Sequence, residues 1–438
     1  MGGNAFKRLL PHATFPRMHP AVYNALKAQV LPIVQSFYAH ATVSPEAPEK
    51  ADFGDLDIIV AGPRDGLTHE EVRAALRATC SIPQEGNRTS NFAIPVDAFE
   101  AVAQAHKAVA AASEPKQDGG ARDADAQVTF QVDLNVNGDY AQWERTVFCS
   151  SYGDLVFFLG VLAQTAGLSF SIYGLRLAEP IRTYPPQTYY LSYSMDDILS
   201  FFGLSMDRWR QGFTTQHDIF AWLATSPFIH VLVARYRSPE YEASTKERLH
   251  DRPMRMKFIN YLRTQELPAC TSGISSTTSL FAVEGNVPEK IDAALRFFGK
   301  AEEHAALVYA SRAQKRAKEL LNGTNLNAWT GVNGKPIRFV MDEVKERLGC
   351  LPAAGGGPAS PVTAVVEPWQ RALSEMEEEE LRTLVVSVKE DMEKDGRLEF
   401  DWRAAKTARL EKKQQQQQRE EVIADPAEEQ TAAAVAVA

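Results

Sequence analysis

The chain has 438 residues, of which 45% are hydrophobic and 24% charged, a composition typical of globular domains and long enough for two or three of them. The net charge of −9 is concentrated at the C-terminal end, because residues 351–438 carry 11 basic and 18 acidic side chains, against 36 and 38 in the first 350 residues. No run of about 18 apolar residues occurs, so no membrane span and no membrane partner is expected. The four cysteines are far apart and form no CxxC pair, which argues against a disulfide framework or a zinc knuckle and favours a reducing compartment.

The N-terminal segment has no acidic residue before Glu46. An acid-poor start is typical of a mitochondrial presequence. The alternative is an ordered amphipathic helix over Ala21–Tyr38, in which Val22, Leu26 and Val30 recur at helical spacing. We favour the helix and predict a cytoplasmic or nuclear protein, with a mitochondrial location left open.

Strand and helix patterns then alternate along the chain. Strands are predicted at Phe53–Ala61, Val128–Val136 and Ser169–Leu177, and helices at Thr68–Cys80, Val96–Ala112 and Tyr152–Thr165. Thr68 is followed three residues later by Glu71, the spacing of a capping box. The polar stretch Ser113–Ala126 is predicted to be a loop. This alternation predicts an α/β domain over residues 20–180, a mixed sheet with flanking helices.

Beyond residue 190 the patterns are helical. Helices are predicted at Met195–Phe202, His217–Thr225, Met254–Thr264, Pro288–Leu321 and Ile337–Leu348. The sequence therefore predicts an all-α accessory domain over residues 190–350. The Gly/Pro/Ala-rich stretch Pro352–Pro368 is predicted to be a linker, and Glu375–Glu421 a solvent-exposed charged helix that fades into disorder. Residues 351–438 would thus be a linker and a charged, partly disordered tail, which could bind a protein partner.

Three aspartates are the candidate catalytic residues. In a strand, Asp55 and Asp57 of the segment GDLDIIV point to one face, because side chains alternate. In the second strand Asp133 lies on a polar face with Thr129, Gln131 and Asn135, opposite an apolar face.

If the two strands are neighbours, the three carboxylates meet at one place. Carboxylates in close contact repel one another and raise each other's pKa unless a cation neutralises them. Mg²⁺ (or Mn²⁺) suits such oxygen ligands together with substrate phosphates, and three carboxylates can hold two metal ions about 4 Å apart. We therefore assign Asp55, Asp57 and Asp133 as metal ligands, with Asp133 as the general base for an attacking hydroxyl group. The structural alternative is that Asp-x-Asp beside a turn is simply a solvated surface feature.

These residues resemble the DNA polymerase β-type nucleotidyltransferases. Residues 54–60 are similar to the G-D-h-D-h-h-h motif of that superfamily, and Val132-Asp133-Leu134 is similar to its third catalytic strand. Tyr152–Leu177 resembles the helix and strand that close the palm subdomain, and residues 218–223 resemble the short helix that follows. Residues 321–326, with 344–348, resemble a helical module of tRNA nucleotidyltransferases. The resemblance implies a palm fold, an NTP substrate and transfer of an NMP group to a hydroxyl acceptor.

The superfamily holds the triphosphate with a Gly-Ser pair about ten residues before the first aspartate. The resemblance therefore implies nucleotide binding by Ser44 and Gly54, although Val43 stands where glycine is expected and Pro45 follows. Glycine allows a backbone to approach phosphate closely. The alternative function is accordingly a catalytically inactive binding or scaffold protein on the same fold.

Residues 207–263 are a candidate nucleic-acid surface. They carry 10 basic and 6 acidic side chains, and aromatic residues are interleaved among them: Trp209, Phe213, Phe228, Tyr236, Tyr241, Phe258 and Tyr261. Such residues can act as stacking platforms in a basic groove. The alternative, which we favour, is a helical core with a solvated basic face.

Overall fold

The computed structural model describes residues 5–84, 89–112, 127–183, 185–238, 252–264, 286–350 and 366–399. Contacts divide the chain into two compact units, Met1–Ala301 and Glu302–Ala438. The loop predicted at Ser113–Ala126, most of the linker predicted at Pro352–Pro368 and the tail beyond residue 399 lie outside the described residues.

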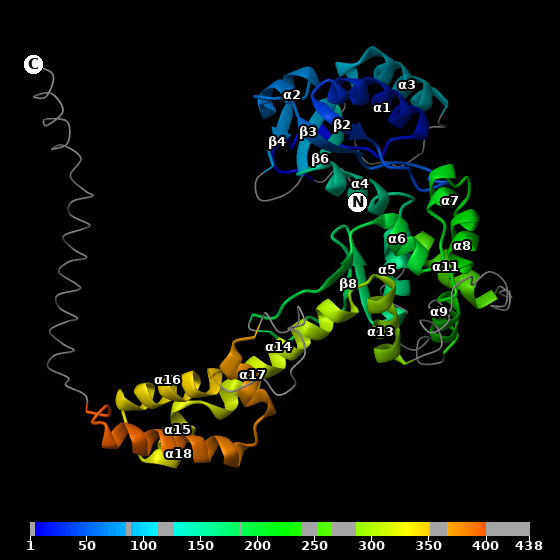
Figure 1. Cartoon of the computed structure of the whole chain (residues 1–438). Coiled ribbons are helices and arrows are strands. Elements are labelled where there is room, and N and C mark those ends of the chain that lie inside the picture. The colour runs from blue at the N-terminus through cyan, green and yellow to red at the C-terminus, as the bar shows by residue number, and fades with distance from the viewer. Residues whose placement is uncertain are drawn as a thin grey trace, which may run out of the picture. The chain divides into compact units, whose positions relative to one another are not determined.

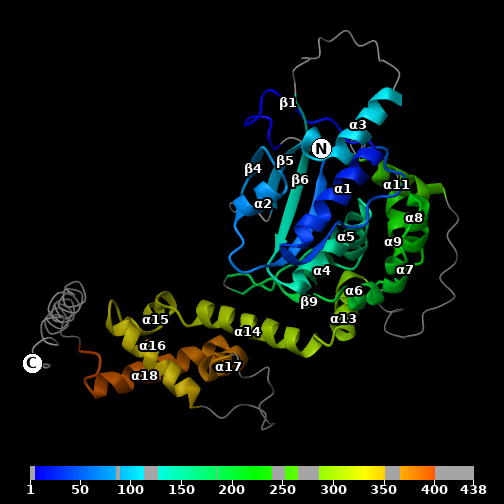
Figure 2. The same cartoon turned by 90° about the horizontal axis from the view of Figure 1, so that it is seen from above.

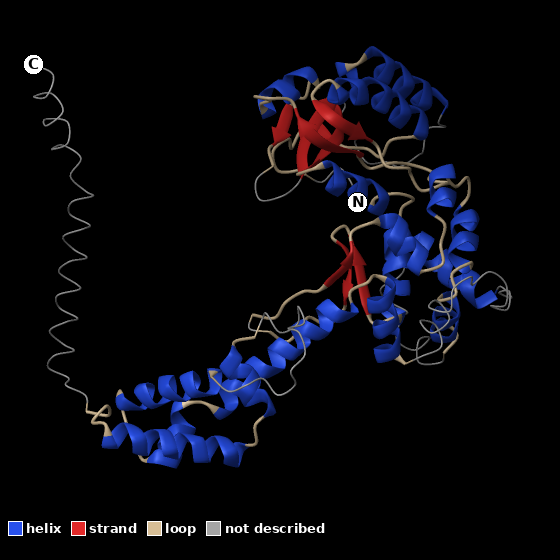
Figure 3. Ribbon diagram, in the orientation of Figure 1, coloured by secondary structure: helices blue, strands red, loops and turns tan. Residues whose placement is uncertain are grey.

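The first unit contains a mixed sheet, drawn in red in Figure 3, which confirms the predicted α/β class. Its strand order is β2-β3-β6-β5-β4, and short β1 pairs with the start of β6. The β3–β6 and β1–β6 pairs are parallel, and the other pairs are antiparallel. The strands are β1 (Ala13–Thr14), β2 (Tyr38–Thr42), β3 (Leu56–Pro63), β4 (Cys80–Ile82), β5 (Thr89–Pro95) and β6 (Gln127–Asn137).

Alternating side chains place the core on one face of this sheet. Leu56, Ile58 and Val60 of β3 lie in the same buried cluster as Val132 and Leu134 of β6. Helices α1 (Pro20–Gln35), α2 (His69–Ala75) and α3 (Glu100–Ala112, preceded by the 3-10 turn η1, Val96–Ala98) contribute to that cluster. Figures 1 and 2 show α1 and α3 side by side over the strands. The predicted N-terminal amphipathic helix is therefore part of the core.

The predicted capping box at Thr68 and Glu71 is confirmed in this unit, whereas the helix at Tyr140–Cys149 was not predicted. Thr68 caps α2, its hydroxyl accepts from the Glu71 amide, and the Glu71 carboxylate accepts from the Thr68 amide. Helix α4 (Tyr140–Cys149) begins after Asp139, whose carboxylate accepts from the Gln142 amide. Helix α4 packs against β3, β6 and β2, and the Trp143 indole donates to the Ile59 carbonyl oxygen. This helix covers part of the face opposite the α1 core.

The segment expected as one strand at Ser169–Leu177 is instead a hairpin. Strands β7 (Leu168–Ser171) and β8 (Gly174–Leu177) pair with each other, and β9 (Tyr190–Ser192) completes a separate three-stranded sheet. Gly174 has φ of 100°, and a Cβ atom there would lie 2.5 Å from the Ser192 carbonyl oxygen. Only glycine fits this turn without strain, and the alternating pattern alone did not reveal it.

Several helices follow among the described residues of the first unit. They are α5 (Leu155–Thr165), α6 (Met195–Phe201), α7 (Met206–Gln211), α8 (Gln216–Ala224), α9 (Ile229–Tyr236), α11 (Pro253–Thr264) and α13 (Val287–Phe297). The single helix predicted over Pro288–Leu321 is wrong, because the chain breaks at Gly299, with φ of 64°, between α13 and α14 (Ala301–Leu320).

Within the described residues, no single helix is long and apolar enough to cross a membrane. Helices α8 and α9 reach the required length and composition only as a pair, and they are bent by 110° at their break.

The described residues of the second unit are mainly helical. Helices α14, α15 (Gly323–Thr330), α16 (Pro336–Gly349), α17 (Pro368–Glu375) and α18 (Glu378–Lys394) share one buried apolar cluster. Leu321, Leu326, Val344 and Leu348, which carry the tRNA nucleotidyltransferase resemblance, all lie in this cluster. The expectation of a solvent-exposed helix is wrong for α18, because its apolar residues recur at helical spacing and one face is buried: Leu381, Val385, Val388 and Met392.

We expect Val385→Ala to destabilise the second unit by about 2–3 kcal/mol, since it removes two fully buried methyl groups and leaves a cavity. Val386→Ala, one residue further and only partly buried, is the matched control and should change stability by less than about 0.5 kcal/mol. Hydrogen exchange of the α18 amides in both variants measures the difference. Equal effects would show that α18 does not bury this face.

Candidate active site

The register of β3 and β6 places two of the predicted aspartates opposite each other. Asp57 is the Cα partner of Asp133 in this parallel pair, flanked by the pairs Leu56–Val132 and Ile58–Leu134. The flanking residues face the α1 core. Because side chains alternate along both strands, Asp57 and Asp133 project from the opposite face and lie side by side.

Asp55 lies one residue before β3 and is half-buried. Its negative charge raises the pKa of both Asp57 and Asp133. The three predicted carboxylates are thus electrostatically coupled, although Asp55 itself stands outside the regular strand. Gly54 forms the bend that precedes it.

Asp133 is held by amide groups. Its carboxylate accepts from the Asn91 amide of β5 at 2.7 Å and from the Gln131 amide at 3.0 and 2.9 Å. The Gln131 side-chain oxygen in turn accepts from the Ala5 backbone amide. Burial raises the pKa of Asp133 to about 6, while the hydrogen bonds from Asn91 and Gln131 lower it and the Asp55 charge raises it. These contacts fix the orientation of a carboxylate that is only 8% exposed.

Among these carboxyl groups, Asp57 has the most strongly raised pKa. Desolvation raises its pKa to about 7, followed by the charges of Asp55, Asp133 and Glu46, and the Lys50 charge opposes them. The Asp57 side chain nevertheless keeps exposed surface. A site that concentrates negative charge in this way favours a bound cation.

A network beside Asp57 was missed at the level of sequence. The Tyr23 hydroxyl donates to Glu46 at 2.6 Å, and the Lys50 ammonium lies 2.8 Å from the other Glu46 oxygen. The Phe53 ring stacks on Tyr23 with centroids 3.8 Å apart, and Lys50 lies over Phe53 at 4.4 Å. Burial raises the pKa of Tyr23, with further contributions from Glu46, Asp57 and Asp55. The sequence contained no signal for this network, because α1 and the loop before β3 meet only in the fold.

Asn91 was missed for a different reason. The segment Thr89–Pro95 alternates, with Phe92 and Ile94 in the core and Asn91 on the opposite face. That pattern is a strand signal, but the segment was not predicted as a strand. Register then pairs Asn91 with Asp133.

Ser44 is not presented as a phosphate ligand in this structure. It is 9% exposed, and its hydroxyl donates to the Val147 carbonyl oxygen of α4 at 3.1 Å. Val43 beside it is buried in the core cluster. To bind a nucleotide as predicted, the Ser44 hydroxyl would have to give up its hydrogen bond to Val147 and donate to a phosphate oxygen instead.

The carboxylates suit a divalent cation only in part. Within the described residues, no group of three or more His, Cys, Asp or Glu side chains is arranged so that it could hold a metal ion. Mg²⁺ in proteins is commonly held by one or two carboxylates, with water and substrate phosphates as its other ligands. The adjacent Asp57 and Asp133 fit that smaller donor set, and Asp55 supplies further negative charge.

Within the described residues of 207–263, most of the candidate stacking aromatics are buried, in agreement with the favoured interpretation of a helical core. Phe213, Phe228, Tyr236 and Phe258 are at most 8% exposed. Trp209 packs against Phe148 and Tyr152, and its indole donates to the Ser151 hydroxyl. Tyr261 is half-buried against Phe220, and Tyr241 lies outside the described residues. These aromatics are buried because they form the core between the helices.

Comparison with known proteins gives no relative to guide the assignment. No protein-family model matches the chain, and no curated protein matches it significantly. The geometry of the described residues therefore carries the functional argument.

The raised acids predict a pH dependence of stability. The folded chain holds protons on Asp57 and Asp133 up to pKa values of about 7 and 6, whereas the unfolded chain releases them near 4. The folded state therefore binds more protons between these values, and this contribution to stability is lost as the pH rises from about 4 to about 7.

We expect Asp57→Asn to stabilise the chain in EDTA at pH 8, because it removes a charge that Asp55 and Asp133 repel. The gain should shrink towards pH 4, where the folded carboxyl group is protonated and carries no charge for its neighbours to repel. Urea unfolding across this pH range measures it, with Asp65→Asn, on an exposed turn, as the control. A gain that is the same at pH 4 and pH 8 would contradict the coupling.

Proposed function

We propose that the chain is a metal-dependent nucleotidyltransferase that moves an NMP group from an NTP to a hydroxyl acceptor. The observation that carries the proposal is the register that sets Asp57 opposite Asp133 on neighbouring parallel strands. The similarity of residues 54–60 and 132–134 to the polymerase β-type superfamily supports it, as does the mixed sheet with flanking helices. On this proposal the sheet of the first unit is a nucleotidyltransferase palm.

Asp57 and Asp133 would hold Mg²⁺ or Mn²⁺ together with the triphosphate, and Asp55 would supply further negative charge beside them. The cation, when bound, neutralises charge on the phosphates and makes the attacking hydroxyl more acidic. Asp133 accepts the hydroxyl proton, and the hydrogen bonds from Asn91 and Gln131 fix the orientation of its carboxylate. The acceptor oxygen bonds to the α-phosphorus, the bond from that phosphorus to the bridging oxygen breaks, and pyrophosphate leaves.

The acceptor is defined here only as a hydroxyl compound. A nucleic-acid acceptor remains part of the proposal, but it would be held without the buried aromatics of residues 207–263. RNA or DNA binding through exposed basic side chains would weaken steeply as salt is raised.

A non-catalytic binding or scaffold protein is the second candidate. Its specific support is the Ser44 hydroxyl, which is engaged by the Val147 carbonyl oxygen, next to a valine where the superfamily has glycine. This candidate predicts metal-dependent NTP binding without turnover, together with a stable protein partner. The charged tail beyond residue 399 is one segment that such a partner could bind.

We expect Asp57→Asn and Asp133→Asn each to lower pyrophosphate release from NTPs by at least about 100-fold, since losing a metal ligand removes several kcal/mol of transition-state stabilisation. The assay supplies Mg²⁺ or Mn²⁺, each NTP and hydroxyl acceptors that include RNA. Asp65→Asn is the control for loss of a surface carboxylate.

Binding separates the two candidates. The double variant Asp55→Ala plus Asp57→Ala should lose metal-dependent NTP binding under either candidate, and equal binding by the wild type and this variant would refute the site. Metal-dependent binding by the wild type without any turnover would favour the binding protein.

A further inference from the structure

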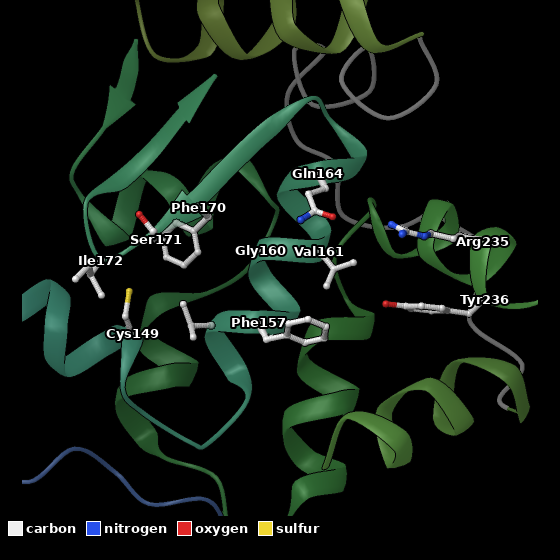
Figure 4. A pocket seen from close by; sticks show the side chains of 11 residues that line it. Cys149, Phe157, Gly160, Val161, Gln164, Phe170, Ser171, Ile172, Arg235 and Tyr236 are labelled. Atoms are coloured by element: carbon white, nitrogen blue, oxygen red, sulfur yellow. The ribbon is translucent and has the colours of Figure 1, made fainter. Parts of the chain in front are cut away.

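A cavity that none of the three aspartates lines lies between α5, β7 and α9. Its volume is about 500 Å³, within the range of about 300–1,000 Å³ that is usual for small-molecule sites. Figure 4 shows its lining residues: those of helix α5 lie between Phe170, Ser171 and Ile172 on one side and Arg235 and Tyr236, at the end of α9, on the other.

The α5 wall is unusual because this helix is apolar on both faces from Leu155 to Ala163, and only its end, at Gln164, brings a polar side chain to the cavity. Leu155, Phe158 and Leu162 are fully buried, while Phe157 and Gly160 on the other side are only half-buried and line the cavity. A helix that is apolar all round is normally covered on every side. Here the second face of α5 meets open space, and a Cβ atom built on Gly160 would meet no atom within 4 Å.

Aromatic rings and one cation define the remaining walls. Phe157, Phe170 and Tyr236 all line the cavity. The Arg255 guanidinium lies 3.7 Å from the Phe157 ring centroid and is itself bound to Asp154 at 2.8 Å, so this ring is held in place. Arg235 and Tyr236 extend from α9 towards α5 (Figure 4). Arg235 is exposed, and within the described part of the chain its guanidinium has no hydrogen-bond or ion-pair partner.

We propose that this cavity binds a small aromatic anion, with the ring system against Phe157, Phe170 and the open face at Gly160, and the anionic group on Arg235. Aromatic side chains favour offset or edge-to-face contact with a ligand ring. A guanidinium binds a carboxylate, sulfonate or phosphate through paired N–H donors. The site is independent of the proposed nucleotidyl transfer.

The test uses the full chain and two fluorescent probes that differ in charge. The anionic probe is 1-anilinonaphthalene-8-sulfonate, and the uncharged analogue is N-phenyl-1-naphthylamine. We expect saturable binding of the sulfonate at one site per chain. Gly160→Leu should weaken the binding of both probes at least about ten-fold, because the new side chain fills the cavity, and leucine is a better helix former than glycine, so the fold is retained.

Matched variants separate the parts of the proposal. Gly349→Leu adds the same side chain to another helical glycine with open space around it, and should leave binding unchanged. Gly160→Ala adds one methyl group and should weaken binding less than Gly160→Leu. Arg235→Gln should weaken binding of the sulfonate probe by about ten-fold, because a charged hydrogen-bond partner is lost. Binding of the uncharged probe should not change.

Thermal unfolding and near-UV circular dichroism check that each variant is folded, since loosely packed states also bind the sulfonate. Absence of saturable binding, or binding that Gly160→Leu leaves unchanged in a folded chain, would overturn the site. If Arg235→Gln weakens the binding of both probes equally, or of neither, the assignment of the anion to Arg235 is overturned.

Discussion

The central constraint in this protein is the adjacency of two carboxylates on parallel strands. Register sets Asp57 opposite Asp133, and the core side chains on either side of each aspartate prevent either strand from shifting by one residue. A shift of one position would turn every buried residue of that strand outwards. The hydrophobic core therefore enforces an electrostatically unfavourable contact, which a bound cation would relieve.

The surrounding residues give the two aspartates different environments. Amides of Asn91 and Gln131 hold Asp133 in a buried position, whereas Asp57 stays in contact with water. The Glu46–Lys50 ion pair and the stacked rings of Tyr23 and Phe53 lie beside Asp57. One acid is thus fixed and the other accessible, an arrangement that suits a metal shared between the protein and a substrate.

The helices serve separate purposes in the two units. In the first, α1 and α3 complete the core under the sheet, and α4 contacts the opposite face and binds the Ser44 hydroxyl. In the second, α14–α18 bury their own apolar cluster, which includes residues at first assigned to a charged tail. Charge density in α18 concealed a regular apolar stripe, because many acidic side chains occupy its solvent-facing positions.

The residue pattern predicts the two aspartate strands, their apolar and polar faces and most of the described helices, because these depend on side-chain period and local capping. It identified Asp55, Asp57 and Asp133 as one group, although the metal that would join them is a proposal. Strand register, the Asn91 contact, the Tyr23–Glu46–Lys50 network and the hairpin at Gly174 were decided only by the tertiary structure. These features join residues that are distant in sequence, or they depend on how closely two backbones approach. Neither property produces a periodic pattern of residues along the chain.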